Sequence, residues 1–343
     1  MEPTQRKLKI LEAVVEAFIK TGEPVGSKAL CENLDFNVSS ATIRNDMAEL
    51  ASLGLLEQTH TSSGRIPTEL GYRIYVDKLM KRIPLTKYEQ SRIYDILYPA
   101  SDAPEHLLEG AAALLSKITG CVAVATSPPG EAAIIKKIRF IQTGRYTAMA
   151  VLITSTGSVK TKLFRCDFVI TPELTEMFEK TMNERFSGVS VTDVTPAFMQ
   201  SSAAALGEMS ILMTNVLLAV NDAARDASAA SAAVRGQSNF FTMPELASGD
   251  GKRVMELLSH SRELERMLTG ADSKASVLIG SEIKHPALSS LSVIASHYKS
   301  TPECSGVLAL IGSVRMDYPK IISALEYTSD IVGNMLSELI EYG

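Results

Sequence analysis

The sequence of 343 residues predicts an α+β protein in which a small helical unit with a β-hairpin precedes a larger, interrupted domain. Apolar residues recur at helical spacing over most of residues 4–83, whereas strand-like runs form two groups, residues 121–165 and residues 276–312. Helical patterns fill the interval between these groups, which indicates one α+β domain interrupted by an insertion. The predicted units are residues 1–83, a discontinuous domain of residues 84–170 and 275–343, and a helix-rich insertion of residues 171–274.

The first element is an amphipathic helix over residues 4–20, which Gly22 ends. A short second helix is expected to begin near Ser27. After another turn, the hydroxyl of Ser39 or Ser40 can accept a backbone N–H bond and so cap a third helix. The apolar residues that we expect the first helix to bury are Leu8, Leu11, Val14, Val15, Phe18 and Ile19.

The third helix, residues 41–53, has two faces of different chemistry. Its inward face carries Ile43, Met47 and Leu50, and its outward face carries Ala41, Thr42, Arg44, Asn45 and Ala48. Short side chains let a helix enter a major groove, where Ala41 can meet a thymine methyl group. Arg44 and Asn45 are suited to bidentate hydrogen bonds with guanine and adenine. A helix, a short turn and such a helix predict a helix-turn-helix unit.

A β-hairpin is predicted directly after this helix, beyond Gly54. Residues 55–57 form one strand, a polar tip follows, and Ile66 begins the return strand before Thr68, which can cap a further helix. A hairpin in this position is a wing, and Arg65 is suited to bind phosphate or the minor groove. The residues predicted to contact DNA are Ser39, Ser40, Ala41, Thr42, Arg44, Asn45, His60, Thr61, Ser63 and Arg65.

Other interpretations of these residues stay open at the level of sequence. The same order of elements also occurs in protein-interaction modules, and Arg44 can instead pair with Asp46 or Glu49 on its own helix. Asp46 faces partly inward, so we predict that it has a structural partner and does not contact DNA. His60 is equally consistent with an ordinary loop residue.

The helical insertion contains an apolar stripe, and two interpretations of it stay open. The stripe can be the core of the insertion, or it can be an isologous dimer interface, which a protein that binds a two-fold operator requires. Its residues are Met209, Leu212, Met213, Val216, Leu217 and Val220.

Composition limits the remaining classes of function. The net charge is −5, so any DNA affinity must come from a few well-placed cations. No apolar run reaches the roughly 18–20 residues that span a bilayer, and the N-terminal pattern is not a secretory or transit signal, so we expect a cytoplasmic protein without membrane contact.

Sequence signatures of an enzyme are missing. The four cysteines and five histidines have no metal-ligand spacing, and no phosphate-binding loop or nucleophile elbow occurs. We therefore expect no catalytic residue, metal or cofactor. A late polar cluster, Arg315, Asp317 and Tyr318, is predicted to form a structural salt bridge and a buried hydroxyl in preference to a ligand site.

Several long stretches resemble the HrcA family of bacterial heat-inducible transcription repressors. They are TGEPVGSKAL, VSSATIRNDMAELASLGLLEQTHTSSGRIPTELGYRIYVDKLM, RGQSNFFTMPE and VRMDYPKIISALEYTS, and the resemblance extends over the whole chain. The recognition-helix stretch of the family matches residues 39–46, and its wing matches residues 60–67. One departure is the family pattern Gly-Pro-Thr-Arg-Met-Asp-Tyr, which reads Gly-Ser-Val-Arg-Met-Asp-Tyr at residues 312–318 and loses the rigidity of proline.

The resemblance implies a winged helix followed by a GAF-like α+β domain that is interrupted by an inserted dimerisation domain. It further implies a homodimer that binds an inverted-repeat operator in double-stranded DNA and represses chaperone operons. A GroEL-type chaperonin keeps members of the family active. An alternative function is a winged-helix regulator whose GAF-like domain senses a small metabolite; a well-formed apolar cavity with polar groups would favour it, and a filled core would favour the repressor.

Overall fold

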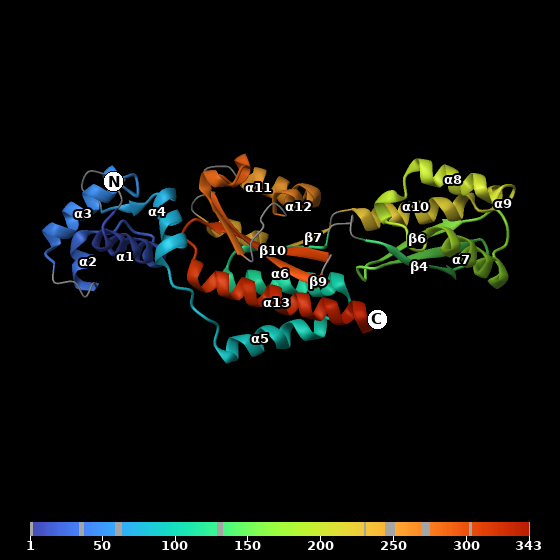
Figure 1. Cartoon of the computed structure of the whole chain (residues 1–343), viewed down its shortest axis with the longest axis horizontal. Coiled ribbons are helices and arrows are strands. Elements are labelled where there is room, and N and C mark those ends of the chain that lie inside the picture. The colour runs from blue at the N-terminus through green and yellow to red at the C-terminus, as the bar shows by residue number, and fades with distance from the viewer. Residues whose placement is uncertain are drawn as a thin grey trace.

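The computed structural model describes residues 3–33, 38–58, 64–128, 133–229, 231–243, 251–268, 275–301 and 304–342. Three units follow one another along the long axis of the molecule, with the N-terminal unit at one end and helices α7–α10 at the other (Figure 1). This arrangement confirms the predicted class, an N-terminal winged helix followed by an interrupted α+β domain. No helix among the described residues is long and apolar enough to cross a membrane.

The N-terminal unit, here called the winged-helix unit, contains the predicted helices and hairpin. Its core includes Ile10, Leu11, Val14 and Val15 of α1, and Gly22 ends that helix in the left-handed conformation. The elements are α1 (Gln5–Thr21), α2 (Ser27–Asn33), α3 (Ser40–Ser52), β1 (Leu56–Glu57), β2 (Ile66–Pro67) and α4 (Glu69–Ile74), which continues as a π-helical turn at Tyr75–Leu79.

The central unit is a five-stranded antiparallel sheet with the strand order β7-β3-β10-β9-β8. Residues alternate between its faces: Ala123 and Leu310 face α6 and α13, whereas Val124 and Ile311 face the side of α11 and α12. The strands are β3 (Val122–Thr126), β7 (Ala232–Arg235), β8 (Ala275–Ile279), β9 (Leu291–Thr301) and β10 (Cys304–Ser313). The helices are α5 (Lys87–Leu97), α6 (Pro104–Thr119), α11 (Gly251–Leu258), α12 (Ser261–Leu268) and α13 (Tyr318–Tyr342).

The third unit, here called the insert, has a sheet and a core of its own. Its strands pair antiparallel in the order β4-β5-β6, and α7 and α10 pack on one face of them through Phe140, Phe164 and Phe178. The elements are β4 (Ile135–Gln142), β5 (Thr147–Thr154), β6 (Val159–Arg165), α7 (Pro172–Phe186), α8 (Pro196–Leu206), α9 (Met209–Leu212) and α10 (Thr214–Ser228). Short 3₁₀ turns lie at Tyr98–Ala100, Val191–Asp193, Gln237–Thr242, Gly280–Glu282 and Pro286–Leu288.

The insert differs from the predicted insertion of residues 171–274. Strands β4–β6, which the sequence pattern places in the discontinuous domain, pair only with one another among the described strands and bury one face on α7 and α10. Within the residues predicted as a helix-rich insertion, α10 ends at Ser228 and residues 232–235 form the edge strand β7 of the central sheet. Alternation identifies a strand but does not say which sheet it joins, because pairing is decided by distant partners.

The apolar stripe of the insertion is mostly core. Met213, Val216 and Val220 are fully buried against β5 and β6, and Leu217 is nearly so. Met209 and Leu212 are the members of the stripe that stay partly exposed. The interpretation of this stripe as an internal core is therefore confirmed for its central residues.

The turn at residues 313–318 joins the winged-helix unit to the central unit. The Tyr318 hydroxyl donates to the Val314 carbonyl at 2.9 Å and lies 2.8 Å from the Ser292 hydroxyl, and its ring contacts Tyr72. Burial raises the pKa of Tyr318, so this hydroxyl stays a donor. The Arg315 guanidinium lies 5.7 Å from the centre of the Phe18 ring. The predicted buried tyrosine hydroxyl is confirmed, and the hydroxyl of Tyr318 holds the turn that lacks the proline.

An ion pair fixes the same junction on the side of β8. Arg73 donates from Nε to a Glu282 carboxylate oxygen at 2.8 Å and from a second nitrogen to the Val277 carbonyl at 2.6 Å. Burial disfavours ionisation of Glu282, but the hydrogen bonds from Arg73 and from the Ile279 N–H outweigh it and lower the pKa of the carboxyl. Apolar residues of both units also form one continuous core. The winged-helix unit is thus firmly docked on the central unit.

Candidate nucleic-acid interface

Helix α3 is anchored through one face and through its N-terminal end. Ile43, Met47 and Leu50 are buried, as predicted, against α1 and α2. The Ser39 hydroxyl accepts a hydrogen bond from the Thr42 N–H at 3.2 Å and caps the helix. The Ser40 hydroxyl lies 3.1 Å from that of Ser27, which ties the start of α3 to the start of α2.

Two carboxylates of α3 are neutralised from α1. The buried Asp46 accepts hydrogen bonds from Arg6 Nε at 2.8 Å and from its terminal nitrogen at 3.0 Å, and Glu49 pairs with Lys7. The hydrogen bond to Asp46 raises the pKa of Arg6 further above its ordinary value. These contacts confirm Asp46 as a structural residue. Sequence reasoning missed Arg6, because a partner 40 positions away leaves no local signal.

The outward face of α3 is left to solvent. Ala41, Arg44, Asn45 and Ala48 are exposed, and Thr42 is half-buried. Within the described parts of the chain, Arg44 and Asn45 make no side-chain hydrogen bond or ion pair, and the pairing of Arg44 with Asp46 or Glu49 is not observed. A protruding guanidinium and a carboxamide on neighbouring residues form a donor and acceptor surface of the kind that reads base edges.

The predicted serine and threonine contacts have a second task in this structure. The Ser39 and Thr42 hydroxyls lie 3.0 Å apart within the helix cap, and Ser40 bonds to Ser27. The structure therefore brings Ala41, Arg44 and Asn45 together on one exposed surface and places the three hydroxyls at the N-terminal edge of that surface. Backbone N–H groups at this helix end favour a phosphate.

The wing is held against the turn between α1 and α2. Val25 and Arg65 exchange two backbone hydrogen bonds of 2.9 Å each, and β1 pairs with β2. Gly64 permits this approach, since a Cβ there would overlap the Val25 carbonyl group. Thr68 accepts a hydrogen bond from the Gly71 N–H and donates to the Gly54 carbonyl at 2.6 Å. The hairpin therefore has a rigid base.

Arg65 lies at this base, whereas the sequence suggested the tip. Its side chain is half-buried, and its Nε has no hydrogen-bond partner among the described residues. The remaining predicted wing contacts, His60, Thr61 and Ser63, lie outside the described residues. An exposed cation that sequence reasoning did not select is Lys28 on α2. In a helix-turn-helix unit the helix before the recognition helix crosses the DNA backbone, so an exposed cation on this helix is suited to contact phosphate.

Comparison with known proteins matches both parts of this architecture. Residues 2–79 match the family described as "Winged helix-turn-helix transcription repressor, HrcA DNA-binding", and residues 105–322 match "HrcA protein C terminal domain". The chain belongs to the HrcA family. It is a heat-inducible transcription repressor with a winged-helix DNA-binding domain.

Individual HrcA relatives cover nearly the whole chain. The heat-inducible transcription repressor HrcA of Clostridium acetobutylicum is 31% identical over 99% of each chain. That of Acetivibrio thermocellus is 29% identical over 98% of this chain and 97% of its own. A crystal structure described as that of a hypothetical protein shares the fold, with a TM-score of 0.69 at 22% identity, and covers 98% of this chain and all of that one.

Proposed function

We propose that this HrcA-family chain represses chaperone operons in the cytoplasm by binding an inverted-repeat operator as a homodimer. The observation that supports it best is the outward face of α3, where Arg44 and Asn45 stay exposed while the neighbouring carboxylates are neutralised by α1. Arg44 and Asn45 read bases, and Lys28, Arg65 and the N-terminus of α3 contact phosphate. Two copies of α3 then enter grooves about one or two helical turns apart, which sets the half-site spacing at ~10 or ~20 base pairs.

The dimer forms through the open face of the insert sheet in this proposal. The face opposite α7 and α10 carries a row of cross-strand neighbours, Ile141, Met149 and Leu163, of which Leu163 is 69% exposed and Ile141 50% exposed. Apolar residues in register on three neighbouring strands form a contiguous patch, which marks an interaction surface on a soluble chain. A two-fold contact here leaves both winged-helix units, at the far end of the molecule, available to DNA (Figure 1).

A matched pair of variants tests this interface. Leu163→Asp places a charge in the patch and should convert the dimer to monomer in sedimentation analysis. Ile211→Asp is the control, because Ile211 is 82% exposed on α9 and lies outside the row. A dimer unaffected by Leu163→Asp, or lost equally in both variants, would show that the contact lies elsewhere.

The family resemblance adds a GroEL-type chaperonin, which we propose keeps the repressor active. A lone protomer exposes the apolar row of the insert, and chaperonins bind such surfaces. The chaperonin should therefore raise the fraction of operator-competent dimer after heating, and Leu163→Asp should remove that gain.

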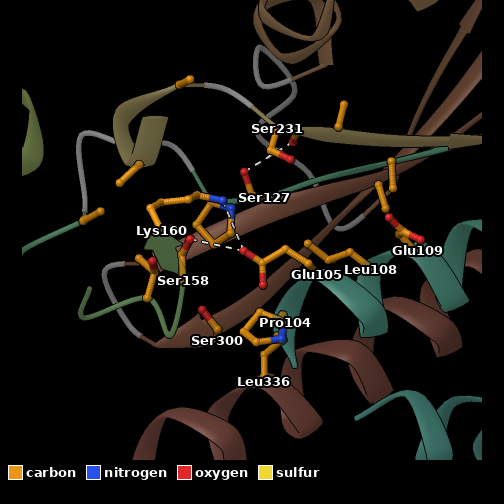
Figure 2. Close-up of a pocket in the computed structure, with 18 residues that line it drawn as sticks. Pro104, Glu105, Leu108, Glu109, Ser127, Ser158, Lys160, Ser231, Ser300 and Leu336 are labelled. Atoms are coloured by element: carbon orange, nitrogen blue, oxygen red, sulfur yellow. Dashed lines mark hydrogen bonds and ion pairs between the residues drawn. The ribbon is translucent and has the colours of Figure 1, made fainter. Parts of the chain in front are cut away.

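The metabolite-sensing alternative receives no support from the interior of the central unit. Apolar side chains fill both faces of its sheet. The cavity at its junction with the insert measures about 120 Å³, below the ~300 Å³ of a typical ligand site. Figure 2 shows Ser158 and Lys160 of the insert directed at Glu105 of α6, which accepts from them at 3.2 and 3.3 Å. Hydrogen bonds and an ion pair therefore join the two units across this cavity.

Fluorescence anisotropy with increasing salt tests the repressor proposal as a whole. An inverted-repeat operator duplex should bind at least several hundred-fold tighter than a scrambled duplex of the same composition. The operator affinity should depend on protein concentration through the dimer equilibrium. Equal and weak binding of both duplexes, by protein shown to be folded, would reject sequence-specific repression.

A further inference from the structure

A groove of about 750 Å³ lies where the winged-helix unit meets the central unit. Ile19 and Lys20 of α1 form one wall, and α5, the C-terminal half of α6 and the start of α13 form the others. Figure 1 shows the chain leaving α4 and descending to α5, which runs beneath α13. The volume is that of a small-molecule site, and both units contribute to it.

The floor of the groove is apolar. Ile93, Leu114 and Ile321 are buried at its base, and Ile96 and Ile118 stay nearly half exposed above them. Isolated exposed apolar residues are common, but these line one concave surface together with the largely exposed ring of Tyr88. An apolar ligand body would cover them.

The rim of the groove is cationic. Five cations, Lys20, Arg92, Lys117, Arg315 and Lys320, line it against two carboxylates, Glu89 and Asp317. Glu89 accepts hydrogen bonds of 2.9 and 2.8 Å from the Thr86 N–H and hydroxyl in a helix cap, and these bonds, together with the charge of Lys320, lower the pKa of its carboxyl.

The lysines of the rim have no hydrogen bond or ion pair to any residue that the structure describes, and Arg92 contacts only the Tyr88 ring at 5.8 Å in that part of the chain. Lys20 and Lys117 lie in the last turns of α1 and α6, where the helix dipole favours cations. Arg92 and Lys320 do not lie at helix C-termini, so the dipole does not account for the charge of the rim.

We infer that this groove binds a small amphiphilic anion, with its apolar body over Ile93 and Ile118 and its anionic group among Lys117, Lys320 and Arg92. Ile19 and Lys20 of α1 form one wall of the same groove, so such a ligand also meets the winged-helix unit and stabilises the docked arrangement of the two units by mass action. This ligand site is additional to the operator and does not depend on repression of any particular operon.

Isothermal titration of the full chain with decanoate tests the inference. Decanoate should bind at least tenfold tighter than decanol, acetate or decyltrimethylammonium, since only decanoate carries both the apolar chain and the negative charge. Decyl phosphate distinguishes the anion: binding equal to that of decanoate assigns the site to amphiphilic anions in general, and weaker binding assigns it to carboxylates. Either result supports the site.

Charge reversal in the rim provides the matched comparison. The double variant Lys117→Glu, Lys320→Glu should lower the affinity for decanoate at least tenfold. The single variant Arg92→Glu should do the same, and because its side chain is exposed it can be used if the double variant does not fold. Lys252→Glu, on an exposed residue of α11 outside the groove, should leave the affinity unchanged. Absence of decanoate binding at millimolar concentration, or equal affinity in all these proteins, would overturn the inference.

Discussion

The two ends of the molecule are attached to the central unit in opposite ways. The winged-helix unit shares one continuous core with it, through Tyr72 and Tyr318, and adds the pair between Arg73 and Glu282. The insert has a self-contained core and meets the central unit through polar contacts such as Glu105 with Lys160. Units that share a packed core tend to unfold cooperatively, whereas units joined by a few polar contacts can unfold separately. The winged-helix unit should therefore unfold together with the central unit, and the insert should unfold alone.

The largest effect expected from this difference is that of Tyr318→Ala. Truncation of a buried aromatic residue costs about 3–5 kcal/mol, and the loss should appear in the winged-helix and central units together because Tyr318 lies in their shared core. Phe178→Ala is the counterpart, since Phe178 is fully buried in the insert. Urea titration followed by hydrogen exchange should place the loss of unfolding free energy in the winged-helix and central units for Tyr318→Ala, and in the insert for Phe178→Ala. A loss spread over all three units in either variant would show a single cooperative fold.

Asp46→Ala should have the next largest effect. It removes the charge-assisted hydrogen bonds from Arg6, worth about 1.5–3 kcal/mol, and the lower figure is expected because the Arg6 side chain is half exposed. The free energy of unfolding measured in urea should fall, and Arg6→Ala should add little once Asp46 is gone. Additive losses in the double variant would show that the pair does not couple α1 to α3.

Arg44→Ala sharpens the comparison within a single helix, because α3 buries one face and exposes the other. The change should cost about 1–3 kcal/mol of binding to the operator and little on random DNA. Stability should stay within about 0.5 kcal/mol, as expected for an exposed site. Lys28→Ala is the control. It should lower the affinity for operator and random DNA alike, and it should reduce the slope of log affinity against log salt concentration by about one. Equal losses on operator and random DNA in Arg44→Ala would remove it as a base reader.

The smallest expected effect is that of Glu282→Gln at the docking surface. The pair with Arg73 is partly exposed, so its loss should cost less than about 1 kcal/mol. The pKa of Glu282 is lowered by Arg73, so the contribution of the ionised carboxyl is complete above its ordinary value of about 4.3 and is lost as the pH falls through the lower folded value. The protection of α4 amides from hydrogen exchange should therefore be lower in Glu282→Gln than in the unmodified protein at pH 7. The two proteins should show equal protection in acid. A difference in protection that persists in acid would show that ionisation of the Glu282 carboxyl is not its cause.

Local signals predicted the winged helix well. Gly22, Ser39 and Thr68 each cap a helix through a hydrogen bond to a residue within four positions, so their capping roles can be read from the sequence. The insert boundary could not be read, because β4–β6 alternate like any strand and their sheet is chosen by contact with α7 and α10. The junction was also hidden, since Arg73 and Glu282 are 209 positions apart. Local chemistry thus predicted which face of α3 is exposed, and only the fold showed what holds that face in place.

The two crossings between the central unit and the insert lie side by side. The Ser127 N–H donates to the Ser231 carbonyl at 2.9 Å, so the chain leaves β3 and returns to β7 one hydrogen bond apart. A segment whose ends nearly touch can be gained or lost without moving the strands that carry it. A short turn from β3 to β7 could therefore replace the insert and keep the five-stranded sheet intact; under the proposed dimer contact, the shortened protein should be a monomer that still carries the winged-helix unit.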